Sequence, residues 1–231
     1  MMYLSRAVPH QEAWKNPQLI SQFKSSYAVH QAVWSLFLGD ENKTRDFLYR
    51  YDMHNGCPVI YIVSEEKPVS QHGLWVVDTK EYNPCISKGD RFYFSVRVNP
   101  VVTKSYVDDK TGKEVHKRHD VIMNRKFHNR ELGVHESNNE ILSDEGFAWL
   151  SSRGEKHGFT VSPSSLMVSC YEKRVFEKST PQGKKREVVL GTLDMEGVLE
   201  VTDAEVFCQM LFAGLGPAKG FGCGLMLIKR V

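Results

Sequence analysis

The sequence lacks paired cysteines and long apolar runs. Its five cysteines are odd in number, widely spaced and never arranged as C-x-x-C, which argues against a disulfide framework and a zinc site and indicates a reducing compartment. No stretch holds about 18 consecutive apolar residues, and the N-terminus lacks the basic-then-apolar pattern of a signal peptide. We therefore expect a cytoplasmic protein without a membrane anchor.

The sequence also carries little net charge. Its 30 basic and 28 acidic residues leave a formal charge of +2, which is too small by itself to indicate a nucleic-acid-binding protein. The basic residues are unevenly distributed, however, and gather in residues 101–130 and 173–186. With 41% hydrophobic residues, the composition is that of a globular protein, and 231 residues suit one large domain or two of about 100 residues each.

The first hundred residues follow an order of elements that is typical of one known domain fold. Apolar periodicity predicts a strand over residues 2–8, a helix over 17–38 and strands over 45–52, 58–63 and 91–98. Asn55-Gly56 is the strongest short-range hairpin signal and lies between the second and third of these strands. The stretch 65–87 is ambiguous, and we interpret it as a crossover. The order is the βαββαβ pattern of a ferredoxin-like domain.

The second half repeats this order. It is predicted to contain a short strand at Val121–Met123, a helix over 144–156, strands over 166–177 and 187–201, a helix after the capping box Thr202–Glu205, and a strand over 224–229. We therefore predict an α+β fold of two tandem ferredoxin-like (RRM-like) βαββαβ domains. The first spans residues 1–100, a basic junction spans 101–116, and the second spans 117–231 with a basic hairpin and a glycine-rich loop.

Five of the seventeen glycines lie between residues 214 and 224. Glycine permits positive φ values and close approach of a partner backbone, so this glycine loop suits contact with a polyanion. Lys219 would add charge and Phe221 a flat face. The alternative is a helix C-cap at Gly214 followed by a close-packed turn. The loop lacks the G-x-x-x-x-G-K-[ST] pattern, which argues against a nucleoside triphosphate site.

Tyr27 and His30 are the candidate catalytic residues. They are three residues apart on the first predicted helix and can address one site, where a histidine and a tyrosine suit acid–base work on a phosphodiester without a metal. The alternative is that both belong to a packed aromatic stripe with Trp34. His116 and His119 have the spacing of a metal pair, but their basic surroundings favour solvated or RNA-facing side chains. We expect no metal site and no cofactor.

Several motifs together resemble the CasE family, the CRISPR RNA endoribonucleases of type I-E Cascade systems within the wider Cas6 group. These motifs are Met2–Ser5, Tyr27–Gln31 with Trp34, Arg97–Pro100, Glu196–Leu199, Gly216–Lys219 and Phe221–Leu225. They lie in both halves and run in the same order as in the family from the first strand to the last, so the resemblance covers nearly the whole chain. The C-terminal glycine motif is the most specific of them.

The resemblance implies a metal-independent endoribonuclease that binds the repeat hairpin of CRISPR precursor RNA and cuts at its 3′ base. The ribose 2′-hydroxyl attacks the adjacent phosphorus and leaves a 2′,3′-cyclic phosphate and a 5′-hydroxyl. By the same resemblance, His30 and Tyr27 match the catalytic residues. The implied RNA-binding residues are Lys219, Gly216, Gly220, Gly222, Arg97, Lys104, Lys173 and Arg174. The implied partners are the repeat RNA and other Cascade subunits, and we expect a monomer when the protein is free.

Two other functions stay open. A non-catalytic RNA-binding subunit with the same tandem fold would keep the glycine loop but would need neither Tyr27 nor His30. A small-molecule enzyme or regulatory module of ferredoxin-like fold is opposed by the sequence, which has no pocket motif, paired carboxylates or cofactor fingerprint. Cleavage of a repeat hairpin in excess chelator would separate the three functions.

Overall fold

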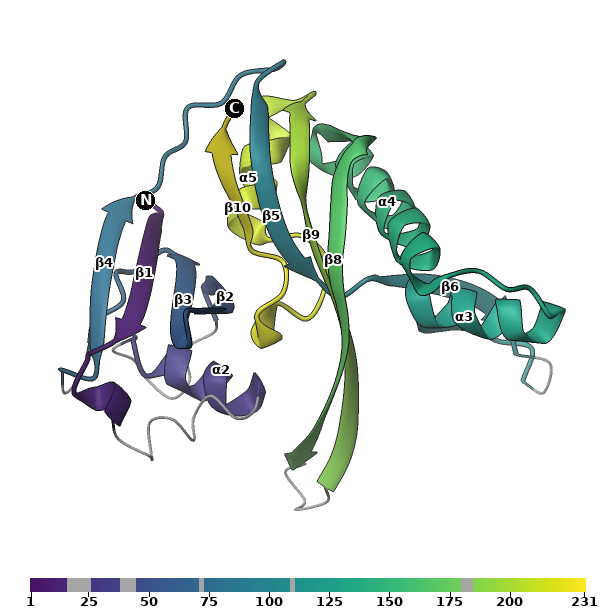
Figure 1. Ribbon diagram of the computed structural model, residues 1–231, viewed down its shortest axis with the longest axis horizontal. Coiled ribbons are helices and arrows are strands. Elements are labelled where there is room, and N and C mark those ends of the chain that lie inside the picture. Colours follow the sequence, from purple (N-terminus) through teal and green to yellow (C-terminus); the bar gives the residue numbers. More distant parts are fainter. Residues whose placement is uncertain (16–25, 38–44, 71–72, 109–110, 180–184) are drawn as a thin grey trace.

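The computed structural model describes residues 1–15, 26–37, 45–70, 73–108, 111–179 and 185–231. In these ranges it contains two four-stranded antiparallel sheets and a two-stranded hairpin. The two sheets stand next to each other, with helices packed on them (Figure 1). Within the described ranges, no helix combines the length and the apolar character needed to cross a lipid bilayer.

The N-terminal sheet has the strand order β2-β3-β1-β4. The elements of this half are β1 (Tyr3–Pro9), the 3-10 helix η1 (Ala13–Lys15), α2 (Ser26–Trp34), β2 (Phe47–His54), β3 (Cys57–Ser64) and β4 (Trp75–Glu81). Asn55 and Gly56, with φ values of 51° and 76°, form the two-residue turn between β2 and β3, which confirms the predicted hairpin. The predicted helix over 17–38 is confirmed for α2, but it ends at Trp34 because residues 35–37 form a turn and a bend. Residues 17–25 and 38 lie outside the described part.

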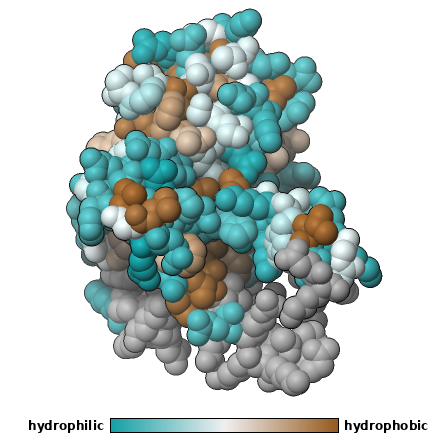
Figure 2. Space-filling view, turned by 90° about the vertical axis from the view of Figure 1, so that its right-hand side faces the viewer, coloured by the Kyte–Doolittle hydropathy of each residue, from teal (hydrophilic) through white to brown (hydrophobic). Residues whose placement is uncertain are grey.

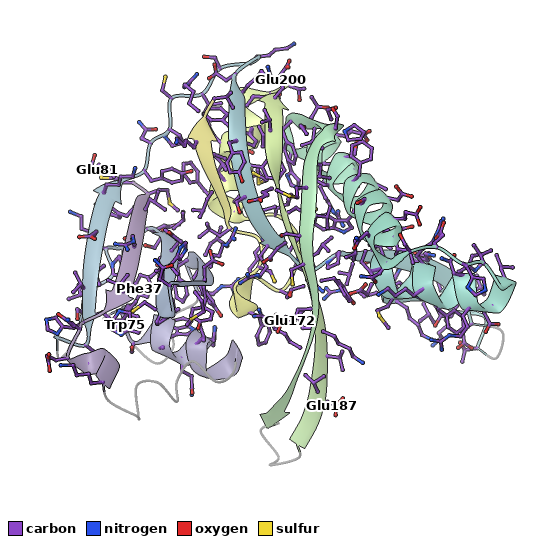
Figure 3. All side chains as sticks on the ribbon, viewed as in Figure 1. Phe37, Trp75, Glu81, Glu172, Glu187 and Glu200 are labelled. Carbon is purple, nitrogen blue, oxygen red and sulfur yellow. The ribbon has the colours of Figure 1, made fainter. Side chains whose placement is uncertain are left out.

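The core of the N-terminal half lies between α2 and one face of its sheet. Val33 and Leu36 are fully buried there, together with Ile60 of β3. Phe37 and Trp75 belong to the same core and lie beside α2 (Figure 3). Burying each such side chain contributes roughly 1.5–3 kcal/mol. The described residues 65–70 form no helix, so the crossover to β4 is irregular there.

The C-terminal sheet has the strand order β10-β5-β9-β8. The elements of this half are β5 (Arg91–Val98), α4 (Asn138–His157), β8 (Phe159–Ser179), β9 (Lys185–Val201), α5 (Ala204–Ala213), the 3-10 helix η3 (Lys219–Phe221) and β10 (Met226–Arg230). Its first strand pairs with its third and fourth, as in the N-terminal sheet. Phe94 of β5 is fully buried in one core with Leu150 of α4 and Phe207 of α5. The fold is therefore two ferredoxin-like domains in tandem, as the sequence predicts.

Side-chain caps determine where two helices of this half begin. Ser137 and Glu140 form a capping box, in which the Ser137 hydroxyl accepts from the Glu140 N–H (3.2 Å) and the Glu140 carboxylate accepts from the Ser137 N–H (2.8 Å). Helix α4 therefore begins at Asn138 rather than at the predicted residue 144. The Asp203 carboxylate accepts from the Val206 N–H (3.1 Å), so the N-cap of α5 is Asp203, one residue after the Thr202 of the predicted capping box.

Two predicted strands were wrongly placed. Arg91–Val98 was expected to complete the N-terminal sheet, but it lies between β10 and β9, because β4 already occupies the position beside β1. Val121–Met123 is not a strand but the first turn of α3 (Val121–Leu132), whose N-terminus is capped by the Asp120 carboxylate.

A boundary at residue 100 would separate β5 from its partner strands. We therefore propose that the N-terminal domain ends within residues 82–90.

A hairpin and a helix are inserted between β5 and α4. The hairpin consists of β6 (Val101–Val107) and β7 (Glu114–Asp120), and α3 follows it, so that the insertion spans residues 101–132. The Trp149 indole N–H donates to the Val101 carbonyl oxygen (3.1 Å), and the Tyr171 hydroxyl donates to an Asp120 carboxylate oxygen (2.9 Å). A Cβ at Gly191 would collide with that same Asp120 oxygen. These contacts fix the insertion to the C-terminal domain.

Arg97 of β5 joins the two domains. Its guanidinium donates to both carboxylate oxygens of Asp194 and to the backbone carbonyl of Tyr51 in β2, each at 2.7 Å. Asp52 of β2 lies 3.4 Å from the same guanidinium. The Arg97 side chain is only 13% exposed. Burial opposes its charge, but Asp194 and Asp52 outweigh that effect and raise the pKa of Arg97, so the guanidinium stays protonated.

Apolar contacts lie beside this polar link. Leu48 of β2 and Val63 of β3 are buried in one cluster with Leu225, which precedes β10. The Tyr82 ring packs edge to face against Phe212 of α5, with 5.7 Å between the ring centroids. The interface therefore combines a buried ionic network with a small apolar cluster.

We expect Arg97→Met to lower the free energy of unfolding by about 3–5 kcal/mol, because Asp194 and Asp52 would lose their cationic partner in a mostly buried position. Urea denaturation followed by circular dichroism measures this loss. Arg6→Met is the matched control: the Arg6 and Asp78 side chains are 50% and 71% exposed and 3.7 Å apart. Such exposed pairs contribute about 0–1 kcal/mol. Equal losses in the two variants would show that Arg97 does not join the domains.

Candidate functional site

The glycine loop, residues 214–224, connects α5 to β10 and is closed at its base. The Leu215 N–H donates to the Gly224 carbonyl oxygen (2.8 Å), and the Gly224 N–H donates to the Arg97 carbonyl oxygen (2.7 Å). Gly222 adopts a φ of 79°, and a Cβ there would lie 3.3 Å from a ring carbon of Tyr49. Glycine is therefore needed where the loop crosses β2 of the other domain.

His30 of α2 lies against this loop. The Trp34 indole N–H donates to His30 Nε2 (3.0 Å), and the backbone of Gly220 lies close enough to the imidazole to affect its pKa. The Gly220 carbonyl oxygen accepts from the Tyr49 hydroxyl as well (2.9 Å). The imidazole lies 6.4 Å from the Phe221 ring, measured between ring centroids. Residues from α2, β2 and η3 thus meet at one point between the domains.

The surroundings of His30 favour the neutral imidazole. Burial lowers the pKa of His30 below its ordinary value of 6.5, and the charge of Arg45 lowers it further. The nearby backbone of Gly220 raises the pKa but does not reverse the shift. Because Nε2 accepts the Trp34 N–H, it holds a lone pair and no proton in this arrangement. At pH 7 His30 is therefore an uncharged proton acceptor.

Arg45 lies beside His30, and Lys219 of the glycine loop lies close enough to Arg45 for their charges to interact. Lys219 is half-buried in η3, and burial together with the charge of Arg45 lowers its pKa. A Cβ at Gly220 would lie 2.9 Å from Arg45 Nη1 and 3.9 Å from His30 Cε1, so the guanidinium and the imidazole flank the same glycine. Sequence reasoning missed Arg45, whose position just before β2 carried no motif. The arrangement combines a neutral base with two positive charges, as a site for a phosphate group requires.

The packed-stripe alternative is partly realised. His30 and Trp34 contact each other in a T-shaped arrangement, with 6.1 Å between ring centroids, and Trp34 packs on Phe47. Packing and hydrogen bonding therefore act on the same imidazole. Tyr27 lies in α2 three residues before His30, but its side chain lies outside the part that the structure describes.

The other predicted RNA-binding residues occupy different surroundings. Lys173 is exposed on β8, whereas the Arg174 guanidinium is bound to the Glu172 carboxylate (2.7 Å), and Figure 3 shows Glu172 midway along β8. Lys104 is exposed on β6 of the insertion. Arg97 uses its guanidinium between the domains, as described above. Gly216, with a φ of 75°, packs against Trp149.

No metal-binding arrangement is apparent in the part of the chain that the structure describes. His116 donates to or accepts from the Ser105 hydroxyl across the β6–β7 hairpin (2.7 Å). His119 stands three residues further along the same strand, so the two side chains point to opposite faces. Among the described residues, no three histidine, cysteine or carboxylate side chains lie together in a way that could hold a metal ion.

The chain matches the family model of the CRISPR associated proteins over residues 2–230. It is also 29% identical over 229 residues to the CRISPR system Cascade subunit CasE of Escherichia coli (strain K12). That match covers 97% of this chain and 98% of the relative. The sequence similarity therefore extends over both domains.

Two solved structures are similar over 99% of this chain. The CRISPR endoribonuclease Cse3 bound to a 19-nucleotide RNA is 21% identical, with a TM-score of 0.68 and 100% of its chain covered. The CRISPR-associated protein Cas6e from Escherichia coli K-12 is 24% identical, with a TM-score of 0.58 and 100% of its chain covered. At these identities the likeness shows a shared fold.

We expect Trp34→Phe to raise the pKa of His30, because the indole N–H can donate only to an unprotonated Nε2 and so stabilises the neutral imidazole. NMR titration of the His30 ring protons measures the shift. Phe47→Leu is the control, because it loosens the packing of the Trp34 ring but keeps the indole N–H. A pKa that moves equally in both variants, or falls in Trp34→Phe, would contradict this account.

Proposed function

This chain belongs to the family of CRISPR associated proteins, and we propose that it is a CRISPR RNA-processing endoribonuclease of Cascade. It binds the repeat hairpin of the precursor RNA, cuts once at the 3′ base of the hairpin and stays bound to the product. Two findings support this proposal. The Escherichia coli relative is a Cascade subunit, and Cse3, which shares the fold, is a CRISPR endoribonuclease with RNA in its structure.

The proposed reaction proceeds without a metal ion. The ribose 2′-hydroxyl loses its proton and attacks the adjacent phosphorus, and the bond between phosphorus and the 5′-oxygen breaks as that oxygen takes up a proton. The products are a 2′,3′-cyclic phosphate and a 5′-hydroxyl. One group must accept the first proton and one must supply the second, and our candidates are His30 and Tyr27.

The observation that carries this proposal is the position of a neutral His30 against the glycine loop and beside Arg45, with Lys219 next to Gly220 in that loop. The lowered pKa of His30 suits it to accept the 2′-hydroxyl proton near pH 7. Because Trp34 occupies Nε2 in the free protein, RNA must displace that hydrogen bond before this nitrogen can take up a proton. Lys219 and Arg45 would stabilise the additional negative charge on the phosphorus centre.

The hairpin is held mainly through its phosphates and shape, because A-form RNA hides its base edges in a deep, narrow groove. We assign Lys219 and the backbone of Gly216, Gly220 and Gly222 to the RNA beside the cut, and Lys173 and Arg174 of β8 to the stem. Arg97 acts by holding the domains together rather than by touching RNA. We also propose that the protein is cytoplasmic, is a monomer when free and contacts other Cascade subunits when assembled.

His30→Ala is expected to slow single-turnover cleavage by about 10²–10⁴-fold while hairpin affinity is retained, because one acid–base group is lost. The same factor is expected with and without EDTA. For the wild-type protein, the rate should rise with pH and be half-maximal below pH 6.5, because burial and the charge of Arg45 hold the pKa of His30 below its ordinary value of 6.5.

His54→Ala is the matched control for this variant, because His54 lies at the far end of β2 against Tyr61. A hairpin with a 2′-deoxy sugar on the 5′ side of the cut should bind but resist cleavage. A wild-type rate in His30→Ala, or complete loss of cutting in EDTA, would refute the assignment. Tight hairpin binding by the wild-type protein without any cleavage would instead favour a non-catalytic RNA-binding subunit.

Lys219→Ala should weaken hairpin binding and flatten its salt dependence. The slope of log affinity against log salt is expected to fall by about 0.7–0.9 units, the value of one lost phosphate contact. Fluorescence anisotropy over a series of salt concentrations measures the slope. Lys88→Ala is the control, because Lys88 is exposed in the segment between the domains. An unchanged slope in Lys219→Ala would show that this ammonium group faces solvent in the complex.

A further inference from the structure

We propose that a cleft between the insertion and α4 is a second RNA-binding site, which holds the single strand where it leaves the repeat hairpin. This inference rests on the proposed function and gives the insertion a role. The cleft has a volume of about 550 Å³. It is lined by Val102, Thr103, Lys104, Val121, Asn124, Glu145, Ala148, Trp149, Ser152, Arg153 and Lys156.

The charges in the cleft favour an anion. Lys104 comes from β6 of the insertion, and Arg153 and Lys156 come from α4, so cations stand on both walls. Glu145 is the one carboxylate in the lining, and it lies 3.9 Å from the Arg125 guanidinium, which partly offsets its charge. Two walls of like charge at a fixed separation attract a phosphate chain that passes between them.

The cleft adjoins the glycine loop through Trp149. Trp149 lies in the lining, and a Cβ at Gly216 would be 3.1 Å from its ring, so one indole separates the cleft from the loop. The Arg153 guanidinium lies over the same indole, 5.1 Å from the ring centroid. Burial and the charges of Arg153, Lys219 and Lys156 lower the pKa of His157. Positive potential therefore extends from the loop to the cleft.

The remaining polar groups suit a sugar–phosphate backbone. Thr103 and Ser152 offer hydroxyls, and Asn124 offers an amide that can donate to phosphate and accept from a ribose 2′-hydroxyl. Trp149 is only 3% exposed, so it forms the floor and leaves no face for base stacking. The volume lies in the range of about 300–1,000 Å³ of small-ligand sites, which fits a few unpaired nucleotides and not a duplex.

The walls of the cleft are fixed before any ligand binds. The Trp149 and Arg153 side chains both donate to the Val101 carbonyl oxygen, at 3.1 and 3.4 Å, and so join α4 to the start of β6. Seen from the side on which α3 and α4 lie, the surface is mostly hydrophilic, and its hydrophobic side chains form separate small patches (Figure 2). A preformed polar cleft pays little ordering cost when a flexible strand binds.

The test compares two uncleavable RNAs with a 2′-deoxy sugar at the cut. One is the bare repeat hairpin, and the other carries about eight unpaired nucleotides at each end, within the usual footprint of a single-strand site. The cleft variant is Lys104→Glu with Lys156→Glu. The control variant, Lys80→Glu with Lys88→Glu, makes the same charge change on exposed lysines of β4 and the segment that follows it. Anisotropy titrations at several salt concentrations give affinities and slopes.

For the extended RNA, the cleft variant is expected to lose about tenfold more affinity than for the bare hairpin, and about 1.4 units of salt slope, as two lost contacts to a single strand require. The control variant should affect both RNAs equally. Equal effects of the cleft variant on both RNAs, or no effect on either, would overturn the inference. The basic cleft would then be better explained as a contact site for an acidic protein surface. If the wild-type protein binds neither RNA, the proposed function itself fails.

Discussion

The guanidinium of Arg97 is the interaction on which the arrangement of the two domains depends. Its side chain binds Asp194 of its own sheet and the backbone of β2 in the other domain, while its carbonyl oxygen accepts the hydrogen bond that ends the glycine loop. One residue therefore sets both the domain contact and the base of the loop. Because His30 belongs to one domain and Gly220 to the other, the site exists only while this contact holds the two parts together. The carboxylates also keep Arg97 charged despite its burial.

Much of the fold follows from local sequence patterns, and the misplaced elements show where such patterns stop. The turn at Asn55-Gly56 acts within a few residues, so the sequence alone identifies it, and the start of α5 is predicted to within one residue. Whether the strand Arg91–Val98 joins the N-terminal or the C-terminal sheet depends on which sheet has an unpaired strand edge. In the N-terminal sheet, β4 occupies the edge of β1 that this strand would need. Val121–Met123 is predicted as a strand because it is a short apolar run in a polar stretch, whereas the Asp120 cap starts a helix there. The capping box at Ser137 was present in the sequence and would have given the correct start of α4.

The candidate site was only partly predictable, because its members are brought together by tertiary contacts. Helical spacing singled out His30 and the glycine pattern singled out Lys219, but no spacing rule connects them. Arg45 has no motif, and only the folded chain places its guanidinium beside Gly220. The bond from Trp34 could have been inferred, since residues four apart on a helix are neighbours. The role of the Gly220 backbone could not have been inferred from the sequence. Every residue has a backbone carbonyl group, and only the fold places that of Gly220 beside the site.

The carbonyl of Gly220 has a consequence for the newly made protein. A ribosome releases α2 and β2 early, but the loop that completes the surroundings of His30 comes near the end of the sequence, after β9 and α5. Until that segment has emerged and β10 has entered its sheet beside β5, the imidazole lacks its contact across the domains. A partly synthesised chain therefore carries the reactive side chain without the site around it. The order of translation thus delays the assembled site until both domains have folded.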